Sequence, residues 1–596
     1  MENVIEQRIS SLRQLMKRER LAAFIFTSSD PHNSEYVPER WEGRKWISGF
    51  DGSAGTAVVT MHSAALWTDS RYFIAAEQQL AGTEYVLMRE RMDGTPSIAE
   101  WLGQELKRSD MTEIGIDGMC SPEADVEALI ADMRANGGIT VRTNLDPLDE
   151  LWLDRPAIPT GKVEIHPLEY SGEACHEKLE RIRKALRRQH ADGMLVSALD
   201  DIAWTLNLRG SDVHCNPVFV SYLLIASDKA ILYIDENKVD SGIKSYLIRE
   251  GVELRPYGDI RKGLKDYFEY NILLDPSATS YALYQEAASN HNIIRAASPV
   301  PMMKAVKNEA EIRGFHNAML RDGVAMVKFL MWLRPAVGQG GQTEMSVSEK
   351  LRQLRAEQPL FRGVSFDTIA GYEAHGAIVH YEASPATDAQ LSPRGFLLLD
   401  SGAQYEDGTT DITRTIALGP ISDEQRRVYT LVLKGHLQLQ NLKFPDHASG
   451  TQLDAAARMA MWREGMNYFH GTGHGVGSFL NVHEGPHQIR MEWKPAPLCA
   501  GMTVTDEPGL YLEGRFGVRT ENTLLITDYK TTEFGRFLQF EPLTLCPIDK
   551  VPIETSMLSD DERRWLDEYH AMVYARLSPC LDEAERKWLA EACAPL

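Results

Sequence analysis

FLLLDSGAQYEDGTTDITRTI, residues 396–416, has the pattern of a β-hairpin in which each strand carries an aspartate. An apolar run predicts a buried strand, Glu406-Asp407-Gly408 predicts the turn, and the β-branched run TDITRTI predicts the returning strand. Asp400 and Asp411 would then lie almost opposite one another. Aspartate is uncommon inside strands, and two facing carboxylates in a partly dry site repel each other unless a cation lies between them. The hairpin therefore favours a metal site over a structural turn.

A second pair of acidic residues repeats this arrangement downstream. In MTVTDEPGLYLEGRFGVRTENTLLIT, residues 502–527, Glu507 ends one strand-like run and Glu521 begins another, with a glycine-rich turn between them. Four carboxylates with one histidine form an oxygen-rich ligand set, which suits Mn²⁺ or Co²⁺ better than a thiolate-rich zinc site would. Shared carboxylates of this number can hold two ions, about 3.5 Å apart.

The stretch FHGTGHGVGSFLNVHEGPH, residues 469–487, is the expected source of that histidine. It ends in a string that matches the H-E-x-x-H zinc motif. That motif needs both histidines on one face of a helix, and Gly485 and Pro486 disfavour a helix. We therefore reject the zinc motif and predict an extended segment from which His483 alone points at a site. The glycine-rich HGTGHG supplies the metal ligand.

The composition indicates a soluble protein of several domains. At 596 residues the chain is too long for one core, so we expect three or four domains. Its 63 basic and 85 acidic residues give a net charge of −22, which argues against nucleic acid or an anionic membrane as partner. The N-terminus lacks the apolar core and cleavage site of a signal peptide. The seven cysteines form no C-x-x-C pair, which indicates free thiols in a reducing compartment, and we assign the cytoplasm.

The first half of the chain contains a repeated helix–strand plan. A basic amphipathic helix in residues 8–21 leads into the apolar strand AAFIFTS, and another in residues 180–191 leads into DGMLVSA. Further apolar strands follow each, which indicates a duplicated α/β unit. The three prolines of residues 153–167 predict a linker between the copies, and residues 297–304 predict a second boundary.

Two helices are predicted with their ends in the second half. Asn308 and Glu311 form a capping box, apolar residues then recur every three or four positions, and Pro335 is expected to end this helix. Near the C-terminus, residues 559–562 form another capping box before the amphipathic WLDEYHAMVYARL. We assign this last helix to surface or oligomer packing.

Several motifs occur in order along the second half: IAGYEAHGAIVHY, DSGAQYEDGTTDITRT, FHGTGHGVG, TDEPGLY and GVRTEN. Together they resemble the creatinase and methionine-aminopeptidase superfamily, and within it the Xaa-Pro aminopeptidases (aminopeptidase P). SGFDGSAGT and LWTDSRYF near the N-terminus resemble the three-domain cytosolic form of that family. The resemblance implies two creatinase-like α/β domains, residues 1–155 and 156–302, and then a pita-bread α+β catalytic domain with a C-terminal extension, residues 303–596.

The resemblance also implies the residues of the site. It implies two divalent metal ions, commonly Mn²⁺ with Co²⁺ or Zn²⁺ as alternatives, held by Asp400, Asp411, His474, Glu507 and Glu521. In this assignment Asp411 and Glu521 bridge the ions, Asp400 holds one, and His474 and Glu507 complete the other. The implied substrate contacts are Arg71, from its own or a partner subunit, and His380, His470, His474 and His483. Arg414 and Arg519, each two or three residues from a ligand, are expected to orient carboxylates.

The implied reaction is hydrolysis of a trans Xaa-Pro bond at the N-terminus of a peptide. Two metal ions lower the pKa of a water toward about 7 and polarise the scissile carbonyl. Glu507 is then ligand and general base, while His380 and His483 stabilise the tetrahedral intermediate. Proline has no N–H and a fixed φ, so a dedicated pocket must recognise its ring. The resemblance further implies a homodimer.

Three other interpretations compete with this one. A prolidase shares the metal ligands but cleaves dipeptides. The two extra N-terminal domains and the sequences of the motifs favour the aminopeptidase. A metal-free, non-catalytic peptide-binding module and a creatinase-type C–N hydrolase lack metal ligands, whereas all five positions are filled here. The other histidines, among them His375 and His487, are predicted to be surface or packing residues, and His487→Ala is predicted to be nearly silent.

Overall fold

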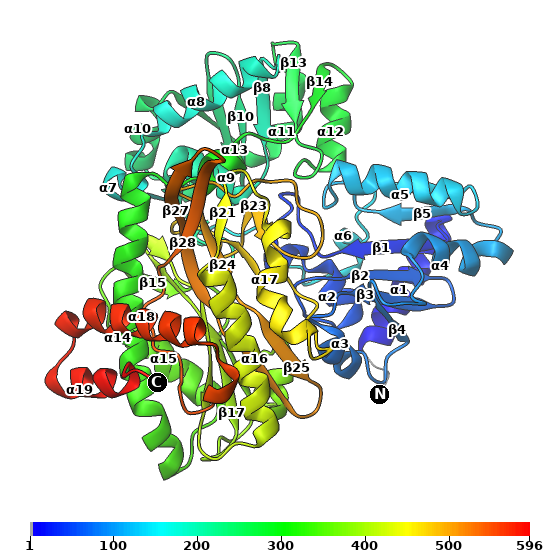
Figure 1. Cartoon of the computed structure of the whole chain (residues 1–596). Coiled ribbons are helices and arrows are strands. Elements are labelled where there is room, and N and C mark those ends of the chain that lie inside the picture. Colours follow the sequence, from blue (N-terminus) through cyan, green and yellow to red (C-terminus); the bar gives the residue numbers. More distant parts are fainter. Residues whose placement is uncertain (1–3) are drawn as a thin grey trace. The chain divides into compact units, whose positions relative to one another are not determined.

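The computed structural model describes residues 4–596 (Figure 1). The contacts within the chain divide it into two compact units. Unit 1 comprises Met1–His166 and Glu173–Val300, and unit 2 comprises Pro167–Gly172 and Pro301–Leu596. In the described part of the chain, no helix combines the length and the apolar character that crossing a lipid bilayer requires.

Unit 1 contains two six-stranded sheets that share one topology. The first sheet has the order β4 (Tyr85–Arg89), β3 (Ala64–Thr68), β2 (Thr56–Thr60), β1 (Ala23–Thr27), β5 (Glu113–Ile116), β6 (Thr140–Arg142). The second has the order β12 (Val252–Arg255), β11 (Ala230–Ile234), β10 (Ser221–Ile225), β8 (Gly193–Val196), β13 (Asn271–Leu274), β14 (Asn292–Arg295). In each, the first strand along the chain lies antiparallel to the second and parallel to the fifth. The predicted duplication is therefore confirmed.

Each copy begins with its predicted amphipathic helix, α1 (Val4–Glu19) or α8 (Cys175–Arg188). Residues at helical spacing form the buried face of these helices, namely Ile9, Leu12 and Met16 in α1 and Leu179, Ile182 and Leu186 in α8. The predicted linker, residues 153–167, is mostly irregular. Gly161 N donates a hydrogen bond to Asp212 Oδ1 at 2.9 Å, so the linker is fastened to the second copy.

Unit 2 contains the long helix α14 (Glu309–Gln339), which begins at the predicted capping box. Asn308 Oδ1 accepts a hydrogen bond from Glu311 N at 3.0 Å, and Glu311 Oε2 accepts one from Asn308 N at 2.9 Å. Pro335 does not end the helix, so that prediction is wrong. A proline removes one backbone hydrogen bond, but Val337 beyond it is 1% exposed within the core, and helices owe most of their stability to such packing.

Helices cover short, mainly antiparallel strands in the rest of unit 2. One sheet joins β16 (Ile369–Tyr372), β17 (Phe396–Ser401) and β20 (Ile412–Ala417), and α14 and α15 (Glu344–Ala356) share a core with it. Another joins β21 (Lys443–Pro445), β28 (Gly535–Pro542), β27 (Asn522–Thr532) and β24 (Thr503–Asp506), and packs on α16 (Asp423–Gln440) and α17 (Gly450–Trp462). Smaller pairings are β15 (Phe361–Val364) with β18 (Ala403–Tyr405) and β19 (Gly408–Thr409), β22 (Gly473–Gly475) with β23 (Glu484–Ile489), and β25 (Gly509–Leu512) with β26 (Phe516–Arg519).

The C-terminal helix α18 (Asp560–Leu577) belongs to the core of unit 2, and α19 (Glu583–Ala592) follows it. Ser559 and Glu562 form its predicted capping box. Its face with Leu566 and Val573, both 0% exposed, packs in one cluster with residues of α16. The assignment to surface or oligomer packing is therefore wrong. An amphipathic pattern shows that one face is buried, not what covers it.

Candidate metal centre

The hairpin of residues 396–416 forms as predicted, with its two-residue turn at Glu406-Asp407. Its register pairs Asp400 with Thr413 and not with Asp411, so the two aspartates are diagonal neighbours and not nearly opposite. The arm that leads from the turn to Asp400 is two residues longer than the arm to Asp411. Directly paired residues and residues two apart on a strand point to the same face. Asp400, Asp411 and Thr413 therefore share one face.

Glu507 and Glu521 come from the neighbouring strands. Glu507 directly follows β24 and Glu521 directly precedes β27, and these two strands are paired antiparallel. Two hydrogen bonds join this pair to the first hairpin. Glu521 N donates to Thr413 O at 3.1 Å, and Thr523 Oγ1 donates to Asp411 O at 3.0 Å. The four predicted carboxylates are thereby held on strands that are fastened to each other.

His474 lies on β22, within the glycine-rich stretch that was predicted to supply a histidine. Its Nε2 is 3.4 Å from Asp411 Oδ2 and 3.6 Å from Glu507 Oε1. Ligand atoms of Asp411, His474 and Glu521 all lie within 4.8 Å of one another. His474 Nδ1 is 2.9 Å from the carbonyl oxygen of Gly475, so Nδ1 carries the proton and Nε2 presents its lone pair to the carboxylates.

The crowded carboxylates are the dominant electrostatic feature of this cluster. Burial, and then the charges of Asp400 and Glu507, hold the pKa of Asp411 well above its ordinary value. Burial, and then the charges of Asp411 and Asp400, do the same to the pKa of Glu521. Asp400 Oδ1 is buried and has no hydrogen-bond partner among residues 4–596. Buried anionic oxygens need a cation or a hydrogen-bond donor, so these residues fit divalent metal ions.

Arg519 is the cation that contacts this cluster through several groups. Its Nη2 donates to Asp400 Oδ2 at 2.7 Å, and its Nη1 donates to the Tyr511 hydroxyl at 2.7 Å. Its Nε donates to Thr413 Oγ1 at 3.2 Å, and Thr413 Oγ1 in turn donates to Glu521 Oε2 at 2.8 Å. One guanidinium thus orients a carboxylate directly and a second one through a hydroxyl.

Arg414, the other arginine predicted beside the ligands, contacts the backbone and no ligand carboxylate in its described hydrogen bonds. Its Nη1 donates to the carbonyl oxygen of Glu521 at 2.6 Å and to that of Thr413 at 3.0 Å. Its side chain is fully buried, at 1% exposure. Arg414 therefore holds the two ligand-bearing strand pairs together from behind.

The three other predicted histidines of unit 2 are His483, which contacts His474, and His470 and His380, which lie next to groups that bond Arg519. The ring of His483 stands edge-on to that of His474, with centroids 4.3 Å apart. His470 Nε2 is 2.7 Å from the Tyr511 hydroxyl. His380 follows Val379, whose carbonyl accepts a hydrogen bond from Arg519 Nη2 at 3.4 Å.

Arg71 belongs to unit 1, on the loop that follows β3. Its guanidinium is paired with Asp69 at 2.7 Å, and about a quarter of its side chain is exposed. Its contact with substrate stays a prediction.

The H-E-x-x-H string does not form a zinc helix. Residues Glu484–Ile489 are strand β23, so the rejection of that motif is confirmed. His487 is fully buried, its Nε2 is 2.7 Å from the carbonyl oxygen of Thr503, and burial lowers its pKa to about 4. Of the two predicted roles, surface or packing residue, the structure shows that His487 is a packing residue.

Sequence reasoning missed two residues that touch this cluster, Thr413 and Tyr511. The strand TDITRTI carried the signal for Thr413, since the two-residue period of a strand places it on the face of Asp411. Tyr511 had no signal of its own. It is an ordinary strand aromatic in sequence, and only the fold brings its hydroxyl to Arg519 and His470.

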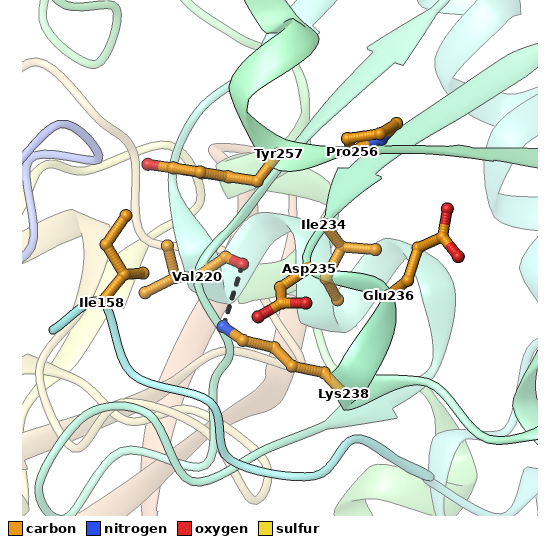
Figure 2. A pocket seen from close by; sticks show the side chains of 8 residues that line it. All are labelled: Ile158, Val220, Ile234, Asp235, Glu236, Lys238, Pro256 and Tyr257. Carbon is orange, nitrogen blue, oxygen red and sulfur yellow. Dashed lines mark hydrogen bonds between the residues drawn. The ribbon is translucent and has the colours of Figure 1, made fainter.

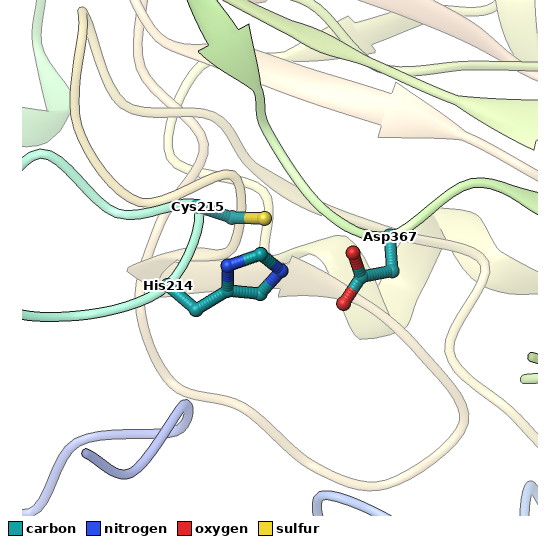
Figure 3. Close-up of side chains that lie close together, drawn as sticks. All are labelled: His214, Cys215 and Asp367. Atoms are coloured by element: carbon teal, nitrogen blue, oxygen red, sulfur yellow. The ribbon is translucent and has the colours of Figure 1, made fainter. Parts of the chain in front are cut away.

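Two other groups of side chains lie away from this cluster. A cavity of about 360 Å³ in unit 1 has mainly apolar walls, and its polar side chains have partners within the protein. Lys238, for example, pairs with Asp212. It also donates a hydrogen bond to Val220 O at 3.4 Å (Figure 2). Figure 3 shows His214 and Cys215, neighbours on a loop of unit 1, and Asp367, which belongs to unit 2; no common site is inferred for residues divided between the units.

Comparison with known proteins accounts for nearly the whole chain. A probable Xaa-Pro aminopeptidase P from Laccaria bicolor is 39% identical over 606 residues, which span 99% of this chain and 93% of that protein. The chain belongs to the Xaa-Pro aminopeptidase P family. Residues 8–140 and 154–311 each match the Creatinase/Prolidase N-terminal domain, residues 313–528 match metallopeptidase family M24, and residues 536–596 match the C-terminal region of peptidase M24.

Two solved structures agree with the fold. An X-prolyl aminopeptidase from Caenorhabditis elegans, described as a cytosolic enzyme with a di-nuclear active site, is 34% identical and superposes with a TM-score of 0.95, covering 99% of this chain and 100% of that one. A Xaa-Pro dipeptidase from Bacillus anthracis is 26% identical with a TM-score of 0.51, covering 63% of this chain and 99% of that one. The predicted fold class, two creatinase-like domains followed by the catalytic domain of the metallopeptidase family, is confirmed.

Proposed function

We propose that this chain is a metal-dependent aminopeptidase that binds two divalent metal ions and removes the N-terminal residue from peptides with proline in second position. The observation that carries the proposal is the convergence of Asp411, His474 and Glu521, whose ligand atoms lie within 4.8 Å of one another. Asp400 lies on the same face of the hairpin as Asp411, and Glu507 Oε1 lies 3.6 Å from His474 Nε2. Similarity over the whole length to Xaa-Pro aminopeptidases supports the substrate class.

The proposed ligands divide into two bridging and three terminal groups. Asp411 and Glu521 would bridge the ions. Their mutual proximity supports this assignment, and so does the charge of Asp411, which raises the pKa of Glu521. Asp400, held by Arg519, would serve one ion, and His474 with Glu507 the other. The oxygen-rich set favours Mn²⁺, with Co²⁺ and Zn²⁺ as alternatives.

When bound, two such ions supply a water of lowered pKa and a Lewis acid for the carbonyl. Glu507 has an 18% exposed side chain, so substrate can reach it, and it would accept the proton of the attacking water and deliver it to the proline nitrogen. His483 and His380 would donate hydrogen bonds to the oxyanion of the tetrahedral intermediate, contacts often worth about 3 kcal/mol. Asp400 would lie near the free amine of the substrate, which limits cleavage to one residue.

A peptide panel assayed with chelator and metal add-back tests this function. We expect release of the first residue from Xaa-Pro-Xaa peptides, loss of activity after chelation, and recovery on addition of Mn²⁺. Peptides with alanine in place of proline should be cleaved poorly. A purified protein that binds no divalent metal and cleaves no Xaa-Pro bond would leave the two metal-free interpretations, the non-catalytic peptide-binding module and the creatinase-type hydrolase.

A prolidase-type dipeptidase remains the second candidate, because the dipeptidase from Bacillus anthracis shares the fold over its whole length. That match covers 63% of this chain, whereas the aminopeptidase from Caenorhabditis elegans covers 99%, which favours the aminopeptidase. Turnover of Xaa-Pro and Xaa-Pro-Xaa by the same preparation separates the two, since a prolidase would cleave only the dipeptide.

We further propose a cytoplasmic homodimer with domains at residues 1–155, 156–302 and 303–596. The cytosolic description of the Caenorhabditis elegans enzyme supports the compartment. Exposed aromatic side chains of unit 2, Trp462, Phe469 and Trp493, support an interface, because exposed apolar groups commonly mark interaction surfaces. Arg71 would contact substrate within or across that dimer. Light scattering at several concentrations measures the assembly state.

A further inference from the structure

We propose that a layer of buried polar side chains behind the metal ligands holds these ligands in position. Helix α18 contributes Tyr569 to this layer and therefore influences metal binding. The polar layer consists of Arg414, His436, Asp506, Asn522 and Tyr569, all 0–4% exposed. This inference rests on the proposed function, and it assigns Tyr569 and Asn522 as positioning residues for the ligands.

Strand geometry places the layer on the far side of the ligands. Asp506 and Asn522 are paired directly across β24 and β27, and each is the chain neighbour of a ligand, Glu507 or Glu521. Consecutive residues of a strand point to opposite faces. When the two glutamates face the metal cluster, Asp506 and Asn522 therefore face away from it, toward helix α16.

His436 on α16 closes this side of the layer. Its Nδ1 lies 3.1 Å from Asp506 Oδ2, and its Nε2 lies 3.3 Å from Asn522 Nδ2. Asn522 Nδ2 also donates to Gln440 Oε1 at 2.8 Å. One face of α16 thus fixes the side chains that neighbour both glutamate ligands.

Arg414 connects the layer to both ligand-bearing strand pairs. It lies on β20, three residues after Asp411, and donates to the carbonyl oxygen of Glu521 at 2.6 Å and to Asn522 Oδ1 at 2.9 Å. Every described hydrogen bond of its guanidinium goes to a carbonyl, amide or phenol oxygen. A buried guanidinium without an ion pair is tolerated only when its N–H groups find such acceptors, so the geometry around Arg414 is tightly specified.

Tyr569 on α18 supplies one of these acceptors. Its hydroxyl accepts from Arg414 Nη2 at 3.0 Å, and carbonyl oxygens of the C-terminal segment lie at hydrogen-bond distance from that hydroxyl, Cys546 O at 2.9 Å and Thr544 O at 3.0 Å. Arg414 itself donates to Cys546 O at 2.8 Å and to Pro547 O at 3.1 Å. The C-terminal segment therefore encloses the arginine that holds the backbone of Glu521.

Loss of the Tyr569 hydroxyl removes one of the three acceptors around the buried Nη2 of Arg414, beside Asn522 Oδ1 and Cys546 O, and weakens the hydrogen bonding of a buried cation. Arg414 can then relax away from Glu521 O, and the ligand oxygens lose their fixed separation. Groups that orient metal ligands typically change metal affinity or activity by 10–100-fold when removed. For one hydroxyl among several acceptors we expect the lower end of that range, about tenfold.

The test compares Tyr569→Phe with Tyr574→Phe, the same substitution on the same helix at a side chain that is 38% exposed. Mn²⁺ affinity is measured by competition with a chelating dye, and the Tm is measured for metal-stripped and Mn²⁺-loaded protein. For Tyr569→Phe we expect Mn²⁺ binding about tenfold weaker and a smaller rise in Tm on loading. Tyr574→Phe should match the wild type in both.

Each result separates this inference from the proposed function. Wild-type protein that binds no Mn²⁺, Co²⁺ or Zn²⁺ contradicts the metal centre itself. The inference is overturned if Tyr569→Phe binds Mn²⁺ as tightly as the wild type and its Tm is lowered equally in the metal-stripped and the Mn²⁺-loaded protein. Tyr569 would then have a purely structural role. Should Tyr569→Phe fail to fold, Asn522→Ser interrupts the layer from the strand side, and unchanged Mn²⁺ affinity in that variant also overturns it.

Discussion

Replacing Asp411 with asparagine is expected to abolish metal binding and, at the same time, to stabilise the metal-free protein. The substitution keeps the size of the side chain and removes one charge from a buried group of carboxylates. Active sites commonly retain such unfavourable charges because the ligand they bind offsets the cost. The two effects therefore have opposite signs and can be measured on one variant.

The magnitude follows from the separation of the charges. A ligand oxygen of Asp411 lies within 4.8 Å of one of Glu521, and two unit charges at that distance repel by about 3.5 kcal/mol at an effective dielectric constant of about 20. Asp400 and Glu507 add to this repulsion, while His483 and Arg519 reduce it. We expect a net gain of about 3 kcal/mol in the free energy of unfolding, or roughly 6 °C in Tm at about 2 °C per kcal/mol.

The sign with respect to pH gives a second check. The pKa of Asp411 is raised in the folded protein, so the metal-free native state binds more protons than the unfolded state above pH ~4. Stability is therefore present at low pH and is lost as the pH rises toward the folded pKa. The advantage of Asp411→Asn over the wild type should grow over the same window.

Calorimetry of chelator-treated protein between pH 5 and 8 measures both effects. Asp528→Asn, at an exposed strand position paired with Arg536, is the matched control and should change stability by less than about 0.5 kcal/mol. Metal-free Asp411→Asn that melts below metal-free wild type, or that still gains stability from Mn²⁺, would refute the reasoning.

Three further changes test other parts of unit 2. Arg519→Lys cannot keep the bonds of the guanidinium to Asp400, Tyr511 and Thr413 together, so Mn²⁺ affinity and kcat should fall about 10–100-fold, whereas Arg515→Lys on the exposed turn of the same hairpin should leave both unchanged. His487→Ala, predicted from the sequence to be nearly silent, should keep its activity per bound metal. Its free energy of unfolding in denaturant titrations should fall by about 2 kcal/mol, because the buried ring and its hydrogen bond are removed. Unchanged stability would contradict this. Burial lowers the pKa of His570 to about 3. The free energy of unfolding of the wild type should therefore fall by up to about 1.4 kcal/mol per pH unit as the pH drops from ~6.5 to ~3. His570→Asn should show a shallower dependence in the same titration, and identical slopes would contradict the assignment.

The ligand hairpins could be anticipated because their signals are local. Turn residues, strand alternation and acidic residues at strand ends all lie within about 25 residues of each other, and the first hairpin forms as these signals indicated. The register was off by two residues, because counting from the turn gives an arm to Asp400 that is two residues longer than the arm to Asp411. The contribution of His474 could be placed only with the help of the family resemblance, because no local pattern links a glycine-rich turn to a distant pair of strands.

The supports of the ligands could not be anticipated, because their contacts join residues far apart in the sequence. Arg414 lies 107 positions from Glu521 and 155 from Tyr569, and its sequence context is that of any strand arginine. The amphipathic pattern of α18 is equally compatible with a partner subunit and with the core of its own chain. The cost of a buried guanidinium without acceptors favours packing of α18 in its own chain, because that packing brings a phenol and several carbonyl oxygens to Arg414. A change in α18 can therefore alter the metal centre through the backbone of Glu521, an effect that contact with the metal ligands alone would not reveal.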